Sequence, residues 1–508
     1  MSEVSMAMPN DINMEVNGIR ERANSLLDES LRGKLGQFMS SSSVSDLLAN
    51  MFEDMSGDIR LLDAGAGVGS LTAAFVAKAA ASANSISATA YEIDDVMASH
   101  LGETLELCGE LLNEFDVDWS PNVIREDFIK LAIEELTKAE FAPSFNKAIL
   151  NPPYLKISAK GPERAEIKKV KFETGNLYSA FVGLAVKLLE DGGELVAITP
   201  RSFCNGPYFN DFRKLILDEC SLNKIHVFNS RKSAFKTDKV LQENVIFHLK
   251  KGAQQVETVQ VASSSCAEDP NPEVFEVPFS DVVSLNNPDR FIHIITNEEE
   301  QKVAHAAGGL PCSLEDLGIQ ASTGRVVDFR TRENLVQDTC DHSVPLIFPQ
   351  HLQNGGVQWP IEGSKKPNSL LNNESTEKLV VPNGTYVLTR RLTAKEEKRR
   401  IAASIYTADI ADVSVVGFEN KTNYFHSNNM PLDEGLAKGL WIFLNSTLVD
   451  QYFRQMNGHT QVNATDLRTL RYPTYEQLVE IANHYDGVLL EQTKVDELVD
   501  KFRTEYPK

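Results

Sequence analysis

The sequence LLDAGAGVGS, residues 61–70, decides the fold of this chain. Its apolar start indicates a buried strand, its three glycines indicate a tight turn, and the apolar pattern of residues 71–78 indicates a helix. Glycines let a ligand approach the backbone closely, and the first turn of a helix offers free N–H groups. The order of strand, glycine turn and helix therefore predicts a nucleotide-type site at the end of this strand.

Short apolar stretches alternate with helical patterns on both sides of this turn. Because strands that alternate with helices form parallel sheets, we expect an α/β fold with a doubly wound, mostly parallel, Rossmann-like sheet. Residues 310–475 are short mixed segments rich in Gly, Asn and Pro, and they predict a second, mixed α+β domain. The strand candidates of the first domain are residues 59–62, 87–91, 148–150, 194–199, 224–228 and 245–249.

These patterns divide the chain into four predicted parts. With 508 residues, the chain is long enough for more than one domain. The predicted parts are an N-terminal helical lead-in (1–38), the α/β domain (39–255), a Ser-, Pro- and acid-rich linker or subdomain (256–309), and a C-terminal domain that ends in helices (310–508).

The charge and cysteine content exclude several classes of protein. The chain has 50 basic and 72 acidic residues and a net charge of −22, which argues against nonspecific coating of nucleic acid or anionic membranes but permits a local basic groove. The six cysteines lack the paired spacing of a structural zinc site, so we expect no metal. The first thirty residues carry acids and no apolar signal-peptide core, and we expect a cytoplasmic protein without membrane contact.

Two carboxylates accompany the glycine turn. Asp63 precedes the first glycine, and Glu92 follows the next strand candidate. A carboxylate at that strand end can bind both hydroxyls of a ribose, so the pair predicts an adenosine-type ligand. The spacing leaves open whether this ligand is a dinucleotide or S-adenosylmethionine, although an Asp before the first glycine is more typical of the methyl donor.

The motif Asn151-Pro152-Pro153-Tyr154 directly follows the strand candidate 148–150. Two prolines end strand pairing, so the motif predicts a rigid turn at the carboxyl edge of the sheet. The Asn151 side-chain carbonyl and the Pro152 backbone carbonyl would accept both protons of an exocyclic amine, which would localise the lone pair on its nitrogen. Tyr154 offers a flat face on which an extruded base can stack. No histidine base is then required for transfer to the amine.

Together these motifs resemble the gamma-class, TaqI-like N6-adenine DNA methyltransferases of restriction–modification systems. The resemblance covers residues 30–250 by motif. It implies a class I methyltransferase sheet, S-adenosylmethionine as the cofactor, and methyl transfer to N6 of an adenine flipped out of double-stranded DNA. It also implies that the C-terminal domain recognises the DNA target. The expected functional partner is a separate restriction endonuclease, and we expect the enzyme to act as a monomer.

The resemblance assigns roles to individual residues. Residues 36–41, GQFMSS, look like the motif that contacts the methionine end of the cofactor, with Ser40 in place of the threonine of many relatives and without their proline. The implied cofactor-binding residues are Gln37, Ser40, Asp63, Gly65, Gly67, Glu92, Asp127, Phe128 and Asn151, the catalytic residues are Asn151, Pro152 and Tyr154, and Phe235 joins Tyr154 in stacking on the target adenine.

Two basic clusters are candidates for binding DNA phosphates. Residues 156–171 and residues 390–400 each contain six basic and two acidic residues. Cations at such positions neutralise phosphates and release counterions, although many basic stretches are only solvated surfaces. The predicted DNA contacts are Lys156, Lys160, Arg390 and Arg391.

Other functions fit parts of the same pattern. An N-P-P-Y turn also suits the amide nitrogen of a protein glutamine, although such an enzyme has no evident use for the long C-terminal region. The N4 amine of cytosine poses the same chemical problem as the N6 amine of adenine. A non-catalytic DNA-binding defence subunit could retain the fold, but the intact Asn151 and Tyr154 argue against it. Pro311-Cys312 follows Glu243-Asn244-Val245 in the wrong order for cytosine-C5 methylation.

Overall fold

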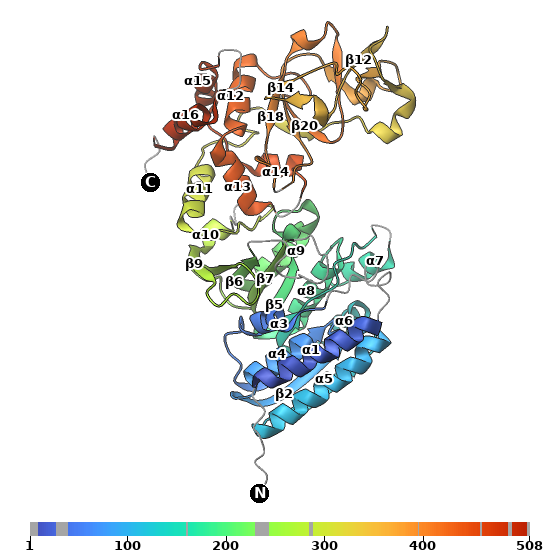
Figure 1. The fold of residues 1–508 in the computed structure, drawn as a ribbon, viewed down its shortest axis with the longest axis vertical. Coiled ribbons are helices and arrows are strands. Elements are labelled where there is room, and N and C mark those ends of the chain that lie inside the picture. The colour runs from blue at the N-terminus through green and yellow to red at the C-terminus, as the bar shows by residue number, and fades with distance from the viewer. Residues whose placement is uncertain are drawn as a thin grey trace. The chain divides into compact units, whose positions relative to one another are not determined.

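The computed structural model describes residues 9–26, 39–158, 161–228, 243–283, 288–394, 396–457, 460–485 and 490–504. The chain divides into two compact units, residues 1–296 (unit 1) and residues 297–508 (unit 2), which are drawn in Figure 1. Within the described part of the chain, no helix combines the length and the hydropathy that a membrane span needs.

Unit 1 is built on a nine-stranded sheet in the order β3-β2-β1-β4-β5-β7-β6-β8-β9. The strands from β3 to β5 are parallel, and β7 lies antiparallel between β5 and β6. This mostly parallel sheet confirms the predicted α/β architecture. The strands are β1 (Gly57–Ala64), β2 (Ala83–Tyr91), β3 (Asp118–Ile124), β4 (Phe145–Leu150), β5 (Leu189–Pro200), β6 (Cys220–Phe228), β7 (Asn244–Lys251), β8 (Thr258–Ser264) and β9 (Glu273–Pro278).

Helices in two groups accompany this sheet. One group contains α1, α3, α4 and α5, which contact one another, and the other contains α6, α8 and α9 (Figure 1). Ile59 and Leu61 of β1 and Ile149 of β4 pack with Phe75 and Val76 of α4 in one hydrophobic core. The helices are α1 (Pro9–Leu26), α3 (Ser42–Ala49), α4 (Ser70–Ala79), α5 (Asp95–Glu114), α6 (Phe128–Leu136), α7 (Pro162–Lys168), α8 (Leu177–Leu188), α9 (Asn210–Glu219) and α10 (Phe279–Val282).

The stretch 256–309, which was expected to be a linker or a subdomain, is built in its first part into the sheet of unit 1. Its first part forms β8, which pairs with β6 in parallel, and β9, which pairs with β8 antiparallel at the edge of the sheet. Val259 and Val261 of β8 are buried, whereas most of β9 is solvent-accessible. An edge strand needs few apolar residues, so its polar composition resembles that of a loop. The division between the units falls after Thr296, within the stretch that was expected to be the linker.

Unit 2 contains small sheets and helices, in agreement with the predicted mixed α+β content. Its sheets have the orders β10-β20-β17-β18, β11-β15-β12-β19-β16 and β13-β14. Tyr386, Tyr406, Phe418 and Tyr424 pack in one of its buried clusters. The elements are α11 (Glu298–Gly308), β10 (Gln320–Thr323), β11 (Leu335–Val336), β12 (Ser343–Ile347), β13 (Leu352–Gln353), β14 (Gly356–Val357), β15 (Ser369–Leu371), β16 (Val380–Pro382), β17 (Tyr386–Arg390), β18 (Ala403–Tyr406), β19 (Val415–Phe418), β20 (Thr422–His426), α12 (Glu434–Leu444), α13 (Thr447–Met456), α14 (Ala464–Thr469), α15 (Tyr475–Ala482) and α16 (Gln492–Thr504).

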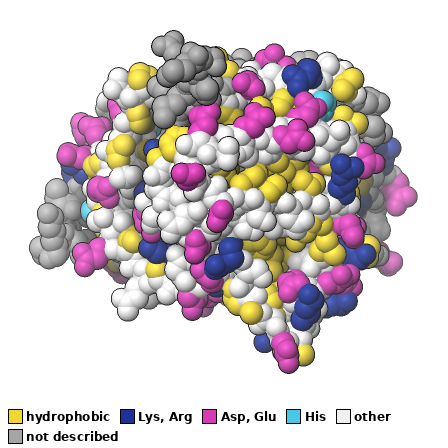
Figure 2. Space-filling model, turned by 90° about the horizontal axis from the view of Figure 1, so that it is seen from below, with side chains coloured by type: hydrophobic (Ala, Val, Ile, Leu, Met, Phe, Trp, Pro, Cys, Tyr) yellow, Lys and Arg dark blue, Asp and Glu magenta, His cyan; other side chains and the backbone are white. Residues whose placement is uncertain are grey.

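Charged side chains of both signs share the surface. On the face drawn in Figure 2, acidic and basic side chains are interspersed, and hydrophobic side chains gather in a band near the centre. Because the net charge of the chain is −22, attraction of a polyanion to this protein would depend on local groups of cations.

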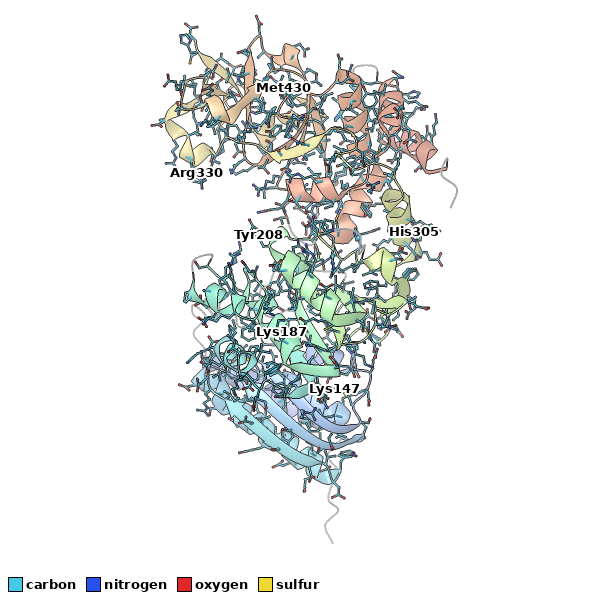
Figure 3. The ribbon with its side chains drawn as sticks, turned by 180° about the vertical axis from the view of Figure 1, so that it is seen from behind. Lys147, Lys187, Tyr208, His305, Arg330 and Met430 are labelled. Carbon is cyan, nitrogen blue, oxygen red and sulfur yellow. The ribbon has the colours of Figure 1, made fainter. Side chains whose placement is uncertain are left out.

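A buried ion pair joins β4 and β5. Lys147 Nζ lies 2.5 Å from Glu194 Oε1, and His248 Nε2 of β7 lies 2.8 Å from Glu194 Oε2. The backbone N–H of Glu53 also donates to Glu194 Oε2, at 2.8 Å. Burial alone would raise the pKa of Glu194, but these hydrogen bonds and the charge of Lys147 hold it at about 2. The Glu194 carboxylate thus connects β4, β5 and β7 with the segment before β1. Its partner Lys147 is labelled in Figure 3.

Candidate active site

A cavity of about 270 Å³ is lined by the loops that follow β1, β2, β3 and β4. The order of the strands along the chain reverses between β1 and β4, and open α/β sheets bind ligands at the carboxyl ends of the strands at such a point. The structure therefore brings most of the predicted cofactor residues to one place. Those among the lining residues are Ser40, Gly65, Gly67, Glu92, Asp127, Phe128 and Asn151.

The glycine turn after β1 forms one wall of the cavity. Gly65, Gly67 and Gly69 have φ angles of +76°, +58° and +84°, in the left-handed region that other residues rarely adopt. A Cβ atom at Gly69 would lie 2.7 Å from Cδ1 of Leu101, so a side chain there would also require Leu101 to shift. The Gly65 N–H donates to the carbonyl of Tyr91 at 3.0 Å, which fixes the turn against the end of β2.

Glu92 is held against this turn at the end of β2. Its side chain accepts hydrogen bonds from the N–H groups of Gly67 and Asp94, both at 2.8 Å. Glu92 is 6% exposed, and burial raises the pKa of its carboxyl in spite of these bonds. Each carboxylate oxygen can accept more than one hydrogen bond, so Glu92 can bind two neighbouring hydroxyls while it remains fixed.

Asp63 lies two positions before Gly65 and is 1% exposed. Its Oδ2 accepts a hydrogen bond from Thr72 Oγ1 at 2.7 Å, whereas Oδ1 has no hydrogen-bond partner among the residues that the structure describes. Burial raises the pKa of Asp63 to about 7. An unpaired, buried carboxylate is unfavourable by itself, and Asp63 is not among the residues that line the cavity.

Aromatic rings form the opposite part of the cavity wall. Phe128 contacts Tyr91 and Phe181, each with ring centroids 5.1 Å apart. Asp127 caps α6, because its Oδ1 accepts a hydrogen bond from the N–H of Lys130 at 3.1 Å. The second oxygen of this carboxylate therefore offers an acceptor beside a flat apolar surface, an arrangement that suits a purine with an exocyclic amine.

The catalytic turn that the sequence predicted begins where β4 ends. Asn151 Nδ2 donates to Ser40 Oγ at 3.0 Å, and the Tyr154 hydroxyl donates to Asn151 Oδ1 at 3.1 Å and to the carbonyl of Ile198 at 3.4 Å. Burial raises the pKa of Tyr154 far above its usual value, so the phenol is protonated at neutral pH. These bonds fix the amide so that its carbonyl end points towards Tyr154.

Two aromatic residues of this site escaped the sequence analysis. Tyr91 and Phe181 both line the cavity and contact Phe128. Tyr91 directly precedes Glu92, so its place at the strand end could have been inferred from the motif. Phe181 lies on α8, far along the chain, and its approach to the cavity is a property of helix packing that no local pattern carries.

Three of the predicted residues, Gln37, Lys160 and Phe235, lie outside the described residues. Lys156 is described and exposed, two positions after Tyr154.

Three arginines of the 390–400 cluster are engaged within unit 2. Arg390 pairs with Glu397 at 2.9 Å, and Arg391 donates to the backbone carbonyl of Asn420 at 3.3 Å. Arg400 is buried and donates to Asn457 Oδ1 at 2.9 Å. The spacing of basic residues in the sequence thus overstates the number of cations that this cluster presents to a polyanion.

Similarities to known proteins extend over nearly the whole chain. Residues 80–235 match the family of the Eco57I restriction-modification methylase. The chain is 65% identical over 502 residues to the type II methyltransferase M.PstI of Providencia stuartii, which covers 99% of each protein. It is 44% identical over 458 residues to the type II methyltransferase M.BsuBI of Bacillus subtilis, with 89% of this chain and 90% of the relative covered. A solved structure of a DrdV–DNA complex is similar with a TM-score of 0.49 and 12% identity, over 94% of this chain and 60% of that chain.

Proposed function

Because the chain belongs to the type II methyltransferases of restriction–modification systems, we propose that it methylates N6 of an adenine that is flipped out of duplex DNA, with S-adenosylmethionine as the methyl donor. The observation that carries this proposal is the position of Asn151. This residue lines the cavity and is hydrogen-bonded to Ser40 on one side and Tyr154 on the other. The amide therefore lies between the predicted cofactor site and the predicted base-stacking ring.

The residues around the cavity fit S-adenosylmethionine. Glu92 offers acceptors for the two ribose hydroxyls, and Phe128 with Asp127 offers a surface and an acceptor for the adenine moiety. When bound, S-adenosylmethionine supplies an electrophilic methyl group attached to a sulfonium sulfur.

Asn151 and Pro152 prepare the amine for attack. The lone pair of adenine N6 is delocalised into the ring, and acceptors on both N–H groups favour the form in which it is localised on nitrogen. A carbonyl oxygen accepts two hydrogen bonds, so Asn151 Oδ1 can bind the amine while it still accepts from Tyr154. With Asn151 and Pro152 as acceptors, N6 would attack the methyl group that S-adenosylmethionine supplies, and one N6 proton would leave to water.

Tyr154 serves as a stacking and orienting group in this proposal. Its raised pKa keeps the hydroxyl protonated, so it cannot take up the proton of the amine at neutral pH. The hydroxyl instead anchors the ring between Asn151 Oδ1 and the end of β5. The phenol ring is thereby held at the catalytic turn, where an extruded base would stack on it.

The other parts of the proposal concern DNA. Unit 2 accounts for the length of chain beyond the catalytic unit, and we assign to it the recognition of the DNA target. Family membership supports a separate restriction endonuclease as the functional partner. We further propose that the enzyme acts as a monomer, which light scattering of the purified protein with and without DNA will test.

The decisive experiment identifies the methylated nucleoside. The purified protein is incubated with radiolabelled S-adenosylmethionine and bacteriophage DNA, the DNA is digested, and the labelled nucleoside is identified by mass spectrometry. Labelled N6-methyldeoxyadenosine is the expected product, and Asn151→Ala should abolish it. Label on N4 of deoxycytidine would change the substrate base, and label on protein alone would refute the proposed DNA methylation.

A further inference from the structure

The loop after β5 holds an exposed aromatic side chain. It consists of two short 3-10 helices, η1 (Arg201–Cys204) and η2 (Pro207–Phe209), and it leads directly into α9. Tyr208 in η2 is 79% exposed, whereas the neighbouring Phe209 is buried. A ring of this size would gain free energy from burial, so its exposure at a fixed position calls for an explanation.

The backbone around Tyr208 is rigidly held. Arg213 of α9 is fully buried, and its guanidinium donates to the carbonyls of Phe203 and Gly206, both at 2.8 Å. A Cβ atom at Gly206 would lie 2.7 Å from the carbonyl oxygen of Ser202, so the turn closes around a residue without a side chain. Tyr208 is therefore presented by a fixed turn.

A series of rings connects this turn to the catalytic turn. The rings of Tyr154 and Tyr178 are 6.2 Å apart in an edge-to-face contact, and Tyr178 stacks on Phe209 at 5.4 Å. The Tyr178 hydroxyl also forms a hydrogen bond of 3.0 Å with Ser202 Oγ. Phe209 adjoins Tyr208 in the chain, so these ring contacts connect the segment that carries Tyr208 to the predicted catalytic turn.

The place of Tyr208 in the fold agrees with this connection. Figure 3 shows Tyr208 at one margin of unit 1, with Lys147 and Lys187 farther towards the other edge of the sheet. Lys187 lies in the last turn of α8, two positions before the start of β5, whereas Tyr208 follows the end of β5. Tyr208 therefore belongs to the carboxyl edge, the same edge that carries Asn151 and Tyr154.

We propose that Tyr208 enters the DNA duplex beside the target base and stacks in the gap that base extrusion leaves. This inference rests on the proposed function, because only an extruded base leaves such a gap. Extrusion breaks stacking on both sides of the target, and an aromatic ring restores part of that stacking without reading the sequence. Wedge-like side chains in other DNA-bending proteins act in a similar way. We assign DNA as the binding partner of Tyr208, because the target base must approach this same carboxyl edge of the sheet.

The test uses a duplex in which 2-aminopurine replaces the adenine that the enzyme methylates, a position first mapped with the wild-type protein. Extrusion of 2-aminopurine from the stack raises its fluorescence. Tyr208→Ala should lose most of this increase and about ten- to a hundred-fold in kcat/KM on unmodified duplex, the range that loss of one base–aromatic stack predicts. Tyr208→Trp should retain both, and Phe115→Ala serves as the control, because Phe115 is a partly exposed ring after the end of α5.

A second duplex separates stacking from a general defect. Removing the base opposite the target weakens the pairing that extrusion must break, so it should restore most of the activity of Tyr208→Ala while changing the wild type little. S-adenosylmethionine should bind the variant as it binds the wild type. A Tyr208→Ala enzyme that equals the wild type on paired DNA, or one whose loss the abasic duplex does not relieve, would overturn the proposal. If the wild type methylates no adenine, the proposed function itself has failed, and if it methylates adenine without a fluorescence change, only extrusion and the role of Tyr208 are refuted.

Discussion

Replacing Asp63 with Asn is expected to stabilise the cofactor-free protein and weaken cofactor binding. In the structure Asp63 Oδ1 has no hydrogen-bond partner among the described residues, and burial raises the pKa of the carboxyl from 3.8 to about 7. The folded protein thus retains a proton that the unfolded chain releases. Wild-type stability should therefore fall as the pH rises from about 4 to about 7, and should fall no further above that range because of this group. Asn cannot ionise, so the variant escapes this loss.

The size of the effect follows from the two pKa values. A raised pKa of about 7 against 3.8 makes the ionised carboxylate cost about 4 kcal/mol at pH 8, at 1.36 kcal/mol per pH unit. At pH 5.5 the Asp63 carboxyl lowers the free energy of unfolding by only about 2 kcal/mol, because in most folded molecules this carboxyl is still protonated. The stability of Asp63→Asn relative to the wild type should therefore increase by about 2 kcal/mol between pH 5.5 and pH 8.

Urea denaturation at the two pH values measures this difference. The chain has three tryptophans, and replacing Trp359 and Trp441 of unit 2 by Phe in both proteins leaves Trp119 of β3 to report on unit 1. Calorimetric titration with S-adenosylmethionine at pH 8 should show weaker binding to Asp63→Asn. A relative stability that is the same at both pH values would refute the electrostatic reasoning. Unchanged cofactor affinity would remove Asp63 from the cofactor site.

Four further predictions concern the catalytic turn, the ion pair and DNA binding. Asn151→Ala should reduce methyl transfer far more than S-adenosylmethionine binding, and a matching loss of cofactor affinity in filter binding would contradict its catalytic role. Ser40→Ala, which removes the acceptor of the Asn151 amide, should lower kcat while Ser40→Thr restores it, as steady-state kinetics will show. Glu194→Gln should lower the free energy of unfolding by about 3 kcal/mol at pH 7, because the pKa of Glu194 is depressed in the folded state. This contribution to stability is complete above pH 4.5 and is lost as the pH falls towards 2. A urea midpoint equal to that of the wild type would contradict this. Neutralising Arg390 and Arg391 should weaken DNA binding and flatten its dependence on salt, and an unchanged salt slope would show that neither contacts phosphate.

The sequence predicted those features that a local pattern encodes. Glycines at 65, 67 and 69 mark left-handed backbone, and the two prolines after Asn151 mark the end of a strand, so the glycine turn and the N-P-P-Y turn could be placed before the fold was known. The ends of parallel strands meet at one edge of the sheet, which explains why Glu92 and Asn151 could be expected in one site, whereas Ser40 was placed there by the family resemblance alone.

What the sequence could not predict depends on partners from elsewhere in the chain. The polar strand β9 resembled a linker because an edge strand can be stabilised by backbone pairing with β8 rather than by apolar burial. From the sequence alone, Arg400 was counted among the cations of the 390–400 cluster. In the structure it is buried and donates to Asn457. Phe181 lacked any motif, since its contact with Phe128 arises from the packing of α8 on α6.

The same reasoning explains why Ser40 can replace the threonine of the resembling family without loss of the proposed mechanism. The bond that matters in the structure is made to the Ser40 hydroxyl oxygen, which accepts from Asn151 Nδ2, and serine and threonine share that oxygen. With Nδ2 occupied in this way, the carbonyl end of the amide is the end that remains directed to Tyr154 and to an incoming amine. Because Ser40 also lines the cavity, a ligand there would contact the residue that sets this orientation. Cofactor binding and the readiness of Asn151 for the amine are therefore expected to be coupled through one hydroxyl group.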